Sequence, residues 1–179
     1  MTIALDVRDL LSAPGSSRRA SLAECLDGLS TEVARVPEDR PVKADLLLES
    51  VVEGVLVSGI VSGDMVLTCA RCLKPIEWAF GLEVRELFAP EASVGSDEYP
   101  LEEGSIDLDP LIRDAVIPAM PYAPLCRPGC LGLCERCGGD RNVGECSCPP
   151  PVDPRWAPLA QVEVRAGRSP APSARRQGR

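Results

Sequence analysis

The feature that most constrains this chain is a run of cysteines between positions 126 and 148, with the pattern C-x3-C-x3-C-x2-C-x8-C-x-C. It holds six cysteines and five glycines in 23 residues, with few large apolar side chains. Such a segment buries too little apolar surface to fold around a core of its own. We therefore expect bound metal to supply its order, because metal binding to a small site is also folding free energy.

The N-terminus and the hydropathy pattern indicate the cellular compartment in which the cysteines are found. The first residues, MTIALDVRDLLSAPG, carry early acids and no basic region ahead of an apolar block, so they do not resemble a signal peptide. No apolar run is long enough to cross a membrane. We expect a cytoplasmic protein without a membrane partner, in which reduced cysteines indicate metal or redox chemistry.

The chain contains no histidine. This excludes histidine general bases, Ser-His-Asp and Cys-His nucleophiles, and every mixed Cys/His zinc site. A metal must then be held by thiolates, with carboxylates as a weaker alternative. Zinc prefers four such ligands in a tetrahedron, so the sequence predicts one or two structural zinc ions.

A second C-x2-C pair, Cys69 and Cys72, lies far upstream of the cluster. In such a pair a tight turn brings both sulfurs to one side, and a following glycine, such as Gly138, permits the backbone conformation that the turn requires. Cys25 stands alone among scattered apolar residues and is predicted to be a buried structural cysteine. Eight cysteines remain, enough for two sites.

The order of these eight cysteines along the chain favours one local and one long-range site, although the assignment of Cys130 rather than Cys134 to the long-range site stays open. The long-range site would tie the upstream hairpin to the segment after the helix. The predicted metal ligands are Cys69, Cys72, Cys126 and Cys130 for the long-range site, and Cys134, Cys137, Cys146 and Cys148 for the local one.

The rest of the chain predicts an α+β fold, an antiparallel β-meander packed with one or two helices, followed by a Cys-rich zinc-binding segment and a disordered tail. A short strand is expected within residues 3–11, residues 20–36 fit either a strand or a weak helix, and 89–105 reads as a loop. Strands are expected at 44–52, 54–61, 65–69 and 76–88, with a hairpin turn at 62–64.

The clearest helix runs from Pro110 to Ala119, with Asp107 or Asp109 as its cap and an apolar face for the sheet. Three parts are therefore predicted: a β-rich core at 1–121 that includes this helix, a Cys-rich zinc module at 122–150, and a disordered Pro/Arg-rich tail at 151–179.

Charge is distributed unevenly. Five of the 19 basic residues lie in positions 164–179, which hold no acid, so positions 1–163 carry 14 basic and 27 acidic residues and a net charge of −13. The tail is predicted to be a solvated, disordered end. The alternative is an arm that binds RNA weakly. An acidic body repels phosphate. We therefore expect partner or RNA contact at Arg127, Arg136 and Arg141, which lie among the cysteines.

The sequence favours structural zinc over other uses of the thiols. A redox C-x2-C pair usually sits in a βαβ unit, whereas Cys69 and Cys72 join two strands. An iron–sulfur cluster accepts the same ligands. A catalytic zinc keeps an open position, for which Glu135 or Glu145 offers a base, but eight neighbouring thiols favour closed sites.

The order of these elements is familiar. A β-meander, a C-x2-C hairpin, an acidic loop, the helix in IDLDPLIRDAVIPAMP and then PLCRPGCLGLCERCGGDRNVGECSC resemble the YceD-type large ribosomal RNA subunit accumulation proteins over roughly residues 3–150. Val152 onward falls outside the pattern. Only the cysteines, as metal ligands, carry over, because the family brings no established catalytic residues.

The resemblance implies a role in making or stabilising 23S ribosomal RNA and in assembling the large subunit. We expect a non-enzymatic factor whose partner is the pre-ribosomal large subunit, its RNA or a ribosomal protein, with no small-molecule substrate. The alternative is a thiol redox or RNA-processing enzyme. A carboxylate-based nuclease is disfavoured because Asp107 and Asp109 fit a helix start, and Glu102 and Glu103 fit a solvated loop.

Overall fold

The computed structural model describes residues 2–90, 98–144, 146–149, 155, 156, 158 and 159. The chain divides into two compact units, residues 1–145 and residues 146–179. The first unit holds the whole sheet and both helices. The strands are β1 (Ala4–Asp6), β2 (Ser17–Glu24), β3 (Ala34–Arg35), β4 (Val42–Val51), β5 (Gly54–Thr68), β6 (Pro75–Ala89), β7 (Tyr99–Glu102) and β8 (Ser105–Asp107), and the helices are α1 (Arg8–Leu11) and α2 (Leu108–Ala119).

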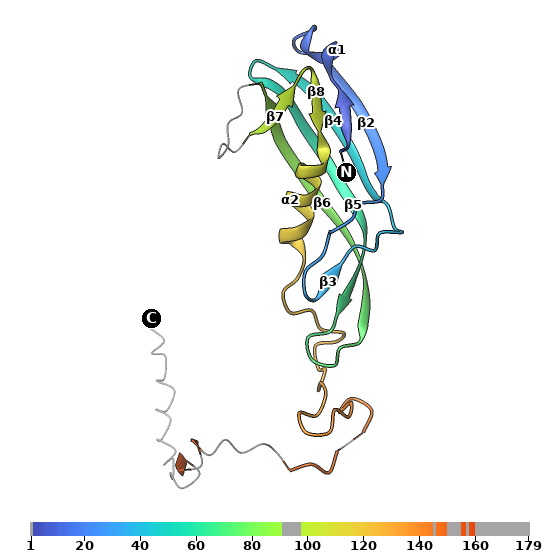
Figure 1. Cartoon of the computed structure of the whole chain (residues 1–179), viewed down its shortest axis with the longest axis vertical. Coiled ribbons are helices and arrows are strands. Elements are labelled where there is room, and N and C mark those ends of the chain that lie inside the picture. The colour runs from blue at the N-terminus through green and yellow to red at the C-terminus, as the bar shows by residue number, and fades with distance from the viewer. Residues whose placement is uncertain (1, 91–97, 145, 150–154, 157, 160–179) are drawn as a thin grey trace, which may run out of the picture. The chain divides into compact units, whose positions relative to one another are not determined.

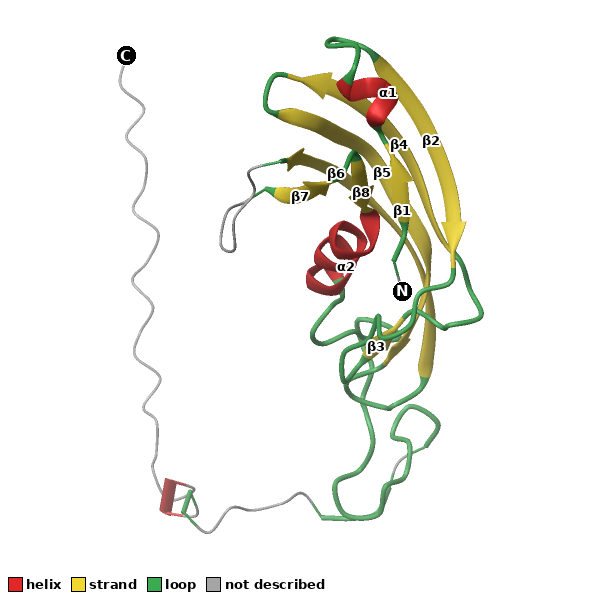
Figure 2. Ribbon diagram, turned by 45° about the horizontal axis from the view of Figure 1, so that its top comes forward, coloured by secondary structure: helices red, strands yellow, loops and turns green. Residues whose placement is uncertain are grey.

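The described strands form one eight-stranded sheet in the order β1-β8-β7-β6-β5-β4-β2, with β3 added beside β5 (Figure 1). All pairs are antiparallel except β6 with β7, which is parallel. The longest strands form the antiparallel meander β4-β5-β6, which confirms the predicted meander in part: the two strands predicted at 54–61 and 65–69 are one strand, β5. The sheet curls around α2, which lies on its concave side (Figure 2).

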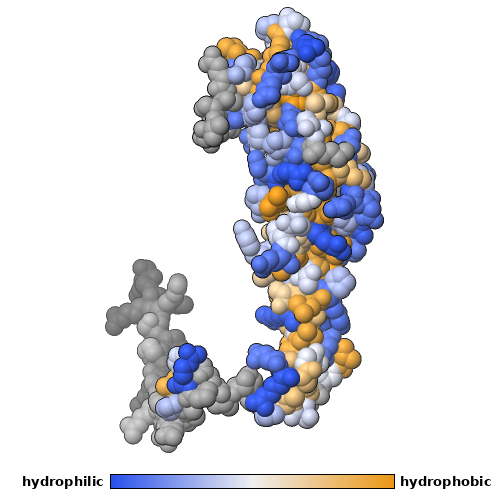
Figure 3. Space-filling model, viewed as in Figure 1, coloured by the Kyte–Doolittle hydropathy of each residue, from blue (hydrophilic) through white to orange (hydrophobic). Residues whose placement is uncertain are grey.

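The core lies between the concave face of the sheet and α2. Along β4, buried and more exposed residues alternate from Val42 to Ser50, as expected of a strand with one face inward. The large buried side chains include Leu48, Phe88 and Ile112. On the face shown in Figure 3, hydrophilic and hydrophobic residues are interspersed over the sheet unit. This sheet therefore has an apolar core independent of the cysteines.

Helix α2 ends at Ala119, as predicted, but begins at Leu108, two residues before the predicted start at Pro110. Asp107 is its N-cap and accepts a hydrogen bond from Asp109 N at 3.0 Å. Its buried face carries Leu108, Leu111, Ile112 and Val116. Pro118 lies in the last turn, where it removes a backbone donor, and the helix ends at Ala119.

The predicted hairpin turn at 62–64 is wrong, because β5 runs straight through it. Gly63 pairs with Phe80 in the β5–β6 ladder, and a Cβ at this glycine would lie 3.0 Å from the Phe80 ring. This glycine therefore makes room for an aromatic side chain instead of forming a turn. The actual turns are at Val52–Glu53 and at residues 69–74.

The predicted loop at 89–105 is only partly correct. Residues 91–97 lie outside the described residues, but β7 and the start of β8 follow. Glu103 and Gly104 between them have φ of 50° and 79°, the backbone of a two-residue hairpin turn. Leu101 and Ile106 are buried, so two short strands with few apolar residues still extend the core.

Near the N-terminus, the strand expected within 3–11 is shorter than predicted and is followed by α1. Within 20–36 the chain forms the end of β2 and then β3, so strand is the correct alternative. The prediction for Cys25 is wrong: this cysteine is exposed, because it follows the last residue of β2. The predicted domain limits at 121 and 150 stay predictions, and the predicted disordered tail lies almost wholly outside the described residues.

Candidate metal centre

The turn between β5 and β6 carries the first two thiols. Cys69 follows the last residue of β5, and Cys72 lies three residues further on. Cys69 N donates to Lys74 O at 2.9 Å and Leu73 N donates to Cys69 O at 2.9 Å, which closes the turn. Both cysteines are buried.

The segment after α2 is held against this turn by backbone hydrogen bonds. Ala70 N donates to Pro124 O at 2.8 Å, and Leu133 N donates to Arg71 O at 3.0 Å. Gly132 has φ of 74° and packs so closely that a Cβ would lie 2.9 Å from Arg71 O. These contacts bring the segment from 124 to 133 beside a turn more than 50 residues upstream.

Four thiols meet where the turn and the segment touch. All Sγ atoms of Cys69, Cys72, Cys126 and Cys130 lie within 4.8 Å of one another. The Cys69–Cys130 sulfurs are 3.9 Å apart and the Cys72–Cys126 sulfurs 3.6 Å. A regular tetrahedron with zinc–sulfur bonds of about 2.3 Å places its ligands about 3.8 Å apart. The arrangement fits a four-coordinate, all-sulfur metal site, and it contains Cys130 rather than Cys134.

Without a metal, these thiols differ in acidity. Backbone N–H groups of Cys126 and Cys72 point to the Cys69 sulfur and lower the pKa of that thiol to about 6, with Cys126 N at 3.4 Å. The hydrogen bond between the sulfurs of Cys72 and Cys126 and the desolvation of the Cys126 sulfur raise the pKa of Cys126 to about 12, although the residue as a whole is exposed. Crowded sulfurs cannot all ionise without a cation. A divalent metal would favour all four thiolates, and its binding would release protons.

One polar side chain organises the surroundings of the site. Asn142 Nδ2 donates to Cys130 Sγ at 3.5 Å and to Asp140 Oδ1 at 2.6 Å. Its Oδ1 accepts from Leu131 N and from Arg127 Nη2, each at 2.8 Å. Asn142 therefore fixes both a ligand and the backbone next to it, as outer-shell residues do in metal sites.

An ion pair joins the upstream turn, residues 69–74, to the segment that contains Asn142. Lys74 Nζ lies 2.6 Å from Asp140 Oδ2. Hydrogen bonds from Lys74 and from Asn142 lower the pKa of Asp140 to about 2, so this carboxylate is ionised throughout the neutral range. Arg71 Nη1 also donates to Cys130 O at 2.8 Å. Sequence reasoning missed all of these polar residues, although they lie within a few positions of the cysteines.

The downstream C-x2-C pair has the same backbone as the upstream one. Cys134 N donates to Gly139 O and Gly138 N donates to Cys134 O, both at 2.8 Å, the same pattern as Cys69 with Lys74 and Leu73. Gly138 has φ of 70°, and Leu73, at the matching position, has φ of 58°. The sequence predicts the glycine, whereas a leucine in this conformation is unexpected because its Cβ is crowded there.

The remaining predicted ligands belong to two units. Cys134 and Cys137 lie in residues 1–145, and Cys146 and Cys148 lie in residues 146–179. These four cysteines have the number and type of ligands that a second metal ion needs. Their grouping into one local site stays a prediction.

The three predicted contact arginines, Arg127, Arg136 and Arg141, are all exposed. The Arg127 side chain donates to Asn142 Oδ1 at 2.8 Å, and the Arg141 backbone is fixed by a hydrogen bond from its N to Gly132 O at 3.0 Å. Arg136 lies between Cys134 and Cys137. Their role in contacting a partner stays a prediction.

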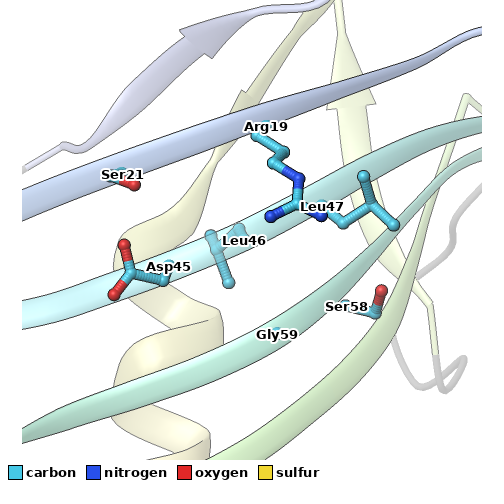
Figure 4. Close-up of a pocket in the computed structure, with 7 residues that line it drawn as sticks. All are labelled: Arg19, Ser21, Asp45, Leu46, Leu47, Ser58 and Gly59. Atoms are coloured by element: carbon cyan, nitrogen blue, oxygen red, sulfur yellow. The ribbon is translucent and has the colours of Figure 1, made fainter.

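A different hollow lies on the outer face of the sheet, over β2, β4 and β5. Figure 4 shows Arg19 and Asp45 projecting over it, with Ser21 and Ser58 along its rim. This mixed and open lining offers no converging set of acid, base and nucleophile. Among the described residues, groups of three or more side chains able to hold a metal are found only among the cysteines. The described helices are also too short or too polar to cross a membrane.

Comparison with known proteins adds to this geometry. The family model described as "Large ribosomal RNA subunit accumulation protein YceD" matches residues 57–163. An uncharacterized protein of Mycobacterium tuberculosis is 36% identical over 140 residues, covering 75% of this chain and 68% of its own. A similar protein of Mycobacterium leprae is 35% identical over 140 residues, covering 75% and 64%.

A plant protein is more distantly similar. The chloroplastic "Large ribosomal RNA subunit accumulation protein YCED homolog 1" of Arabidopsis thaliana is 23% identical over 170 residues, covering 77% of this chain and 52% of its own. No solved structure matches the chain. The family match covers more than half of the sequence and includes both C-x2-C pairs. The chain therefore belongs to the YceD family of large ribosomal RNA subunit accumulation proteins.

Proposed function

We propose that this protein is a non-enzymatic, cytoplasmic factor for the accumulation, processing or stability of 23S ribosomal RNA, and hence for large-subunit assembly. Membership of the YceD family and the name of the plant relative support this role. The partner would be the pre-ribosomal large subunit, through its RNA or one of its proteins.

Zinc is the proposed cofactor. The observation that carries this proposal is the group of four sulfurs from Cys69, Cys72, Cys126 and Cys130, all within 4.8 Å. Four protein ligands leave no open position for water or substrate, which is typical of structural rather than catalytic zinc. When bound, the metal supplies a cross-link between the β5–β6 turn and the segment after α2. A second zinc at Cys134, Cys137, Cys146 and Cys148 is proposed from their spacing.

The contact with the pre-ribosomal particle is proposed at Arg127, Arg136 and Arg141. Their side chains are exposed on a body whose net charge is strongly negative. A cluster of cations at one end would direct the approach of phosphate to that end, because cation–phosphate neutralisation dominates affinity for RNA.

The experiment is sedimentation of lysates from a host that lacks its own copy of the gene and expresses variants of this one. Replacing Arg127, Arg136 and Arg141 together with Glu should remove the protein from large-subunit precursors and lower the ratio of 23S to 16S RNA. The matched control replaces Arg19, Arg35 and Arg85, exposed arginines of the sheet, with Glu. Equal loss of co-sedimentation in the control would show a general charge effect, and unchanged association of the first variant would refute the arginine patch.

A metal-free purified protein with a readily formed disulfide between Cys69 and Cys72 would instead favour the thiol redox alternative. Anaerobic purification followed by metal analysis distinguishes the two. We expect bound zinc and no reaction of Cys69 with alkylating reagents until a chelator is added.

A further inference from the structure

The lining of a groove at the C-terminal end of α2 includes none of the cysteines and none of the contact arginines. Its space is about 500 Å³. One wall is the connection between β2 and β3, and the other is the end of α2 with the residues that follow; these elements lie close together in Figures 1 and 2. The groove is lined by Thr31, Glu32, Val33, Ile117, Pro118, Met120, Pro121 and Tyr122.

The two walls are fixed to each other. Arg113, on α2, donates to Asp27 O at 2.7 Å and forms an ion pair with the Asp27 carboxylate at 3.3 Å. Leu26 and Leu29 of the β2–β3 connection are buried in the core. The groove is therefore formed before any partner arrives, which lowers the entropy that binding must offset.

The lining is mostly apolar, and one of its side chains, Tyr122, is almost fully exposed to solvent. Tyr122 is 91% exposed, and Ile117 is 37% exposed although it directly follows the buried Val116. Pro118 in the last turn of α2 and Pro121 just after the helix both restrict the backbone of this part of the chain. A solvent-exposed aromatic ring beside an apolar groove is typical of a site that binds another protein.

The charge of the groove lining is negative. Glu32 is the one charged residue in the lining, and it takes part in no ion pair among the described residues. Ile117 and Pro118, in the last turn of α2, line the groove, and this turn contains no basic residue. A helix C-terminus and a carboxylate both attract cations, and the Tyr122 ring adds a cation–π surface.

We propose that this groove binds a basic, extended protein segment, with arginine or lysine beside Glu32 and Tyr122 and apolar side chains on Ile117 and the prolines. Long basic side chains suit the site because their aliphatic stems cover apolar surface while their charged ends reach the carboxylate. RNA does not fit, because its phosphates would face Glu32 and the helix C-terminus. None of the groove residues is a proposed zinc ligand or one of the contact arginines Arg127, Arg136 and Arg141.

The test uses the full-length protein and two short fluorescent peptides, one alternating arginine with leucine and one alternating glutamate with leucine. Anisotropy titrations measure affinity, and amide chemical shifts locate the bound peptide. We expect the arginine peptide to bind, with the largest shifts at residues 31–33 and 117–122. Glu32→Lys and Tyr122→Ala should each weaken it roughly tenfold.

Two matched variants separate the groove from general charge and folding effects. Tyr122→Phe keeps the ring and should stay within about twofold of the wild type. Glu53→Lys makes the same charge change at an exposed turn on another part of the sheet and should behave likewise.

Four results would overturn the proposal. They are no binding of the arginine peptide, equal binding of the glutamate peptide, shifts confined to other surfaces, and an RNA oligonucleotide whose binding is lost in Tyr122→Ala. None of them affects metal content or the arginine patch, so this proposal and the proposed function fail separately.

Discussion

The sheet of β4, β5 and β6 and the segment from 124 to 142 both have defined backbones, yet they bury different side chains. The inward positions of the sheet are valines, leucines and phenylalanines packed on α2. The buried residues of the segment are Pro124, Cys130 and Gly132. Apolar burial stabilises the first, whereas the second has backbone hydrogen bonds, a few polar contacts and four adjacent sulfurs. The difference supports the proposal that one chain combines a sheet stabilised by its apolar core with a segment whose order depends on bound metal.

The largest expected effect is the loss of the metal. Structural zinc contributes roughly 10–16 kcal/mol of apparent binding free energy in small domains at neutral pH. Chelation should therefore remove the hydrogen-exchange protection of amides in 69–74 and 124–142 while those of β4 to β6 stay protected. Cys130→Ser should give the same pattern. Loss of protection in the whole sheet would contradict the division into two sources of order.

The second prediction removes a side chain from the apolar core of the sheet and leaves the cysteines unchanged. Phe88 is fully buried and stacks on Tyr99 with ring centroids 5.2 Å apart. Phe88→Ala should lower the free energy of unfolding of the sheet by about 3–5 kcal/mol, measured by urea denaturation. Zinc affinity should change little while the protein remains folded, and a large fall in affinity at low denaturant would mean that the two regions fold as one.

A smaller effect is expected at the residue that joins the ligands to their surroundings. Asn142→Leu removes the donor to Cys130 Sγ and the acceptor for Leu131 N. Loss of such outer-shell contacts usually lowers metal affinity about 10- to 100-fold, which competition with a chromophoric chelator measures. The sheet should unfold at the same urea concentration as the wild type. Unchanged affinity would show that Asn142 only shapes the loop.

The smallest effect concerns the two matching turns. Leu73 adopts φ of 58° where the downstream turn has Gly138, and this conformation costs a leucine about 1–2 kcal/mol. Leu73→Gly should relieve that strain and stabilise the turn by up to about 1 kcal/mol after the entropy of the glycine is counted. Gly138→Leu should destabilise its turn by a similar amount. Thermal unfolding of both variants in excess zinc provides the measurement.

Long, regular elements were predictable because local residues determine them. The cap at Asp107, Pro110 and the spacing of Leu111, Ile112 and Val116 locate α2. Runs rich in Val, Leu and Ile locate β4 and the two ends of β5, and alternating apolar residues locate β6. The eight metal-ligand candidates followed from residue type and spacing alone, and so did the alternative that included Cys130 in the long-range group.

The missed features depend on contacts between distant residues. Gly63 reads as a turn residue until Phe80 is seen to pack against it. The pairing of β1 with β8 joins residues about 100 positions apart, and short strands such as these carry little periodicity. Asn142 and Lys74 become part of the metal centre only when the segment after α2 lies against the β5–β6 turn. Sequence spacing cannot reveal such tertiary neighbours.

The central claim is that Cys69, Cys72, Cys126 and Cys130 bind one zinc ion without help from the other cysteines. X-ray absorption at the zinc edge, on a variant with Cys134, Cys137, Cys146 and Cys148 replaced by Ser, tests it most directly. We predict one zinc per chain with four sulfur neighbours at about 2.3 Å. A metal-free variant, or a shell that contains oxygen or nitrogen ligands, would contradict the claim.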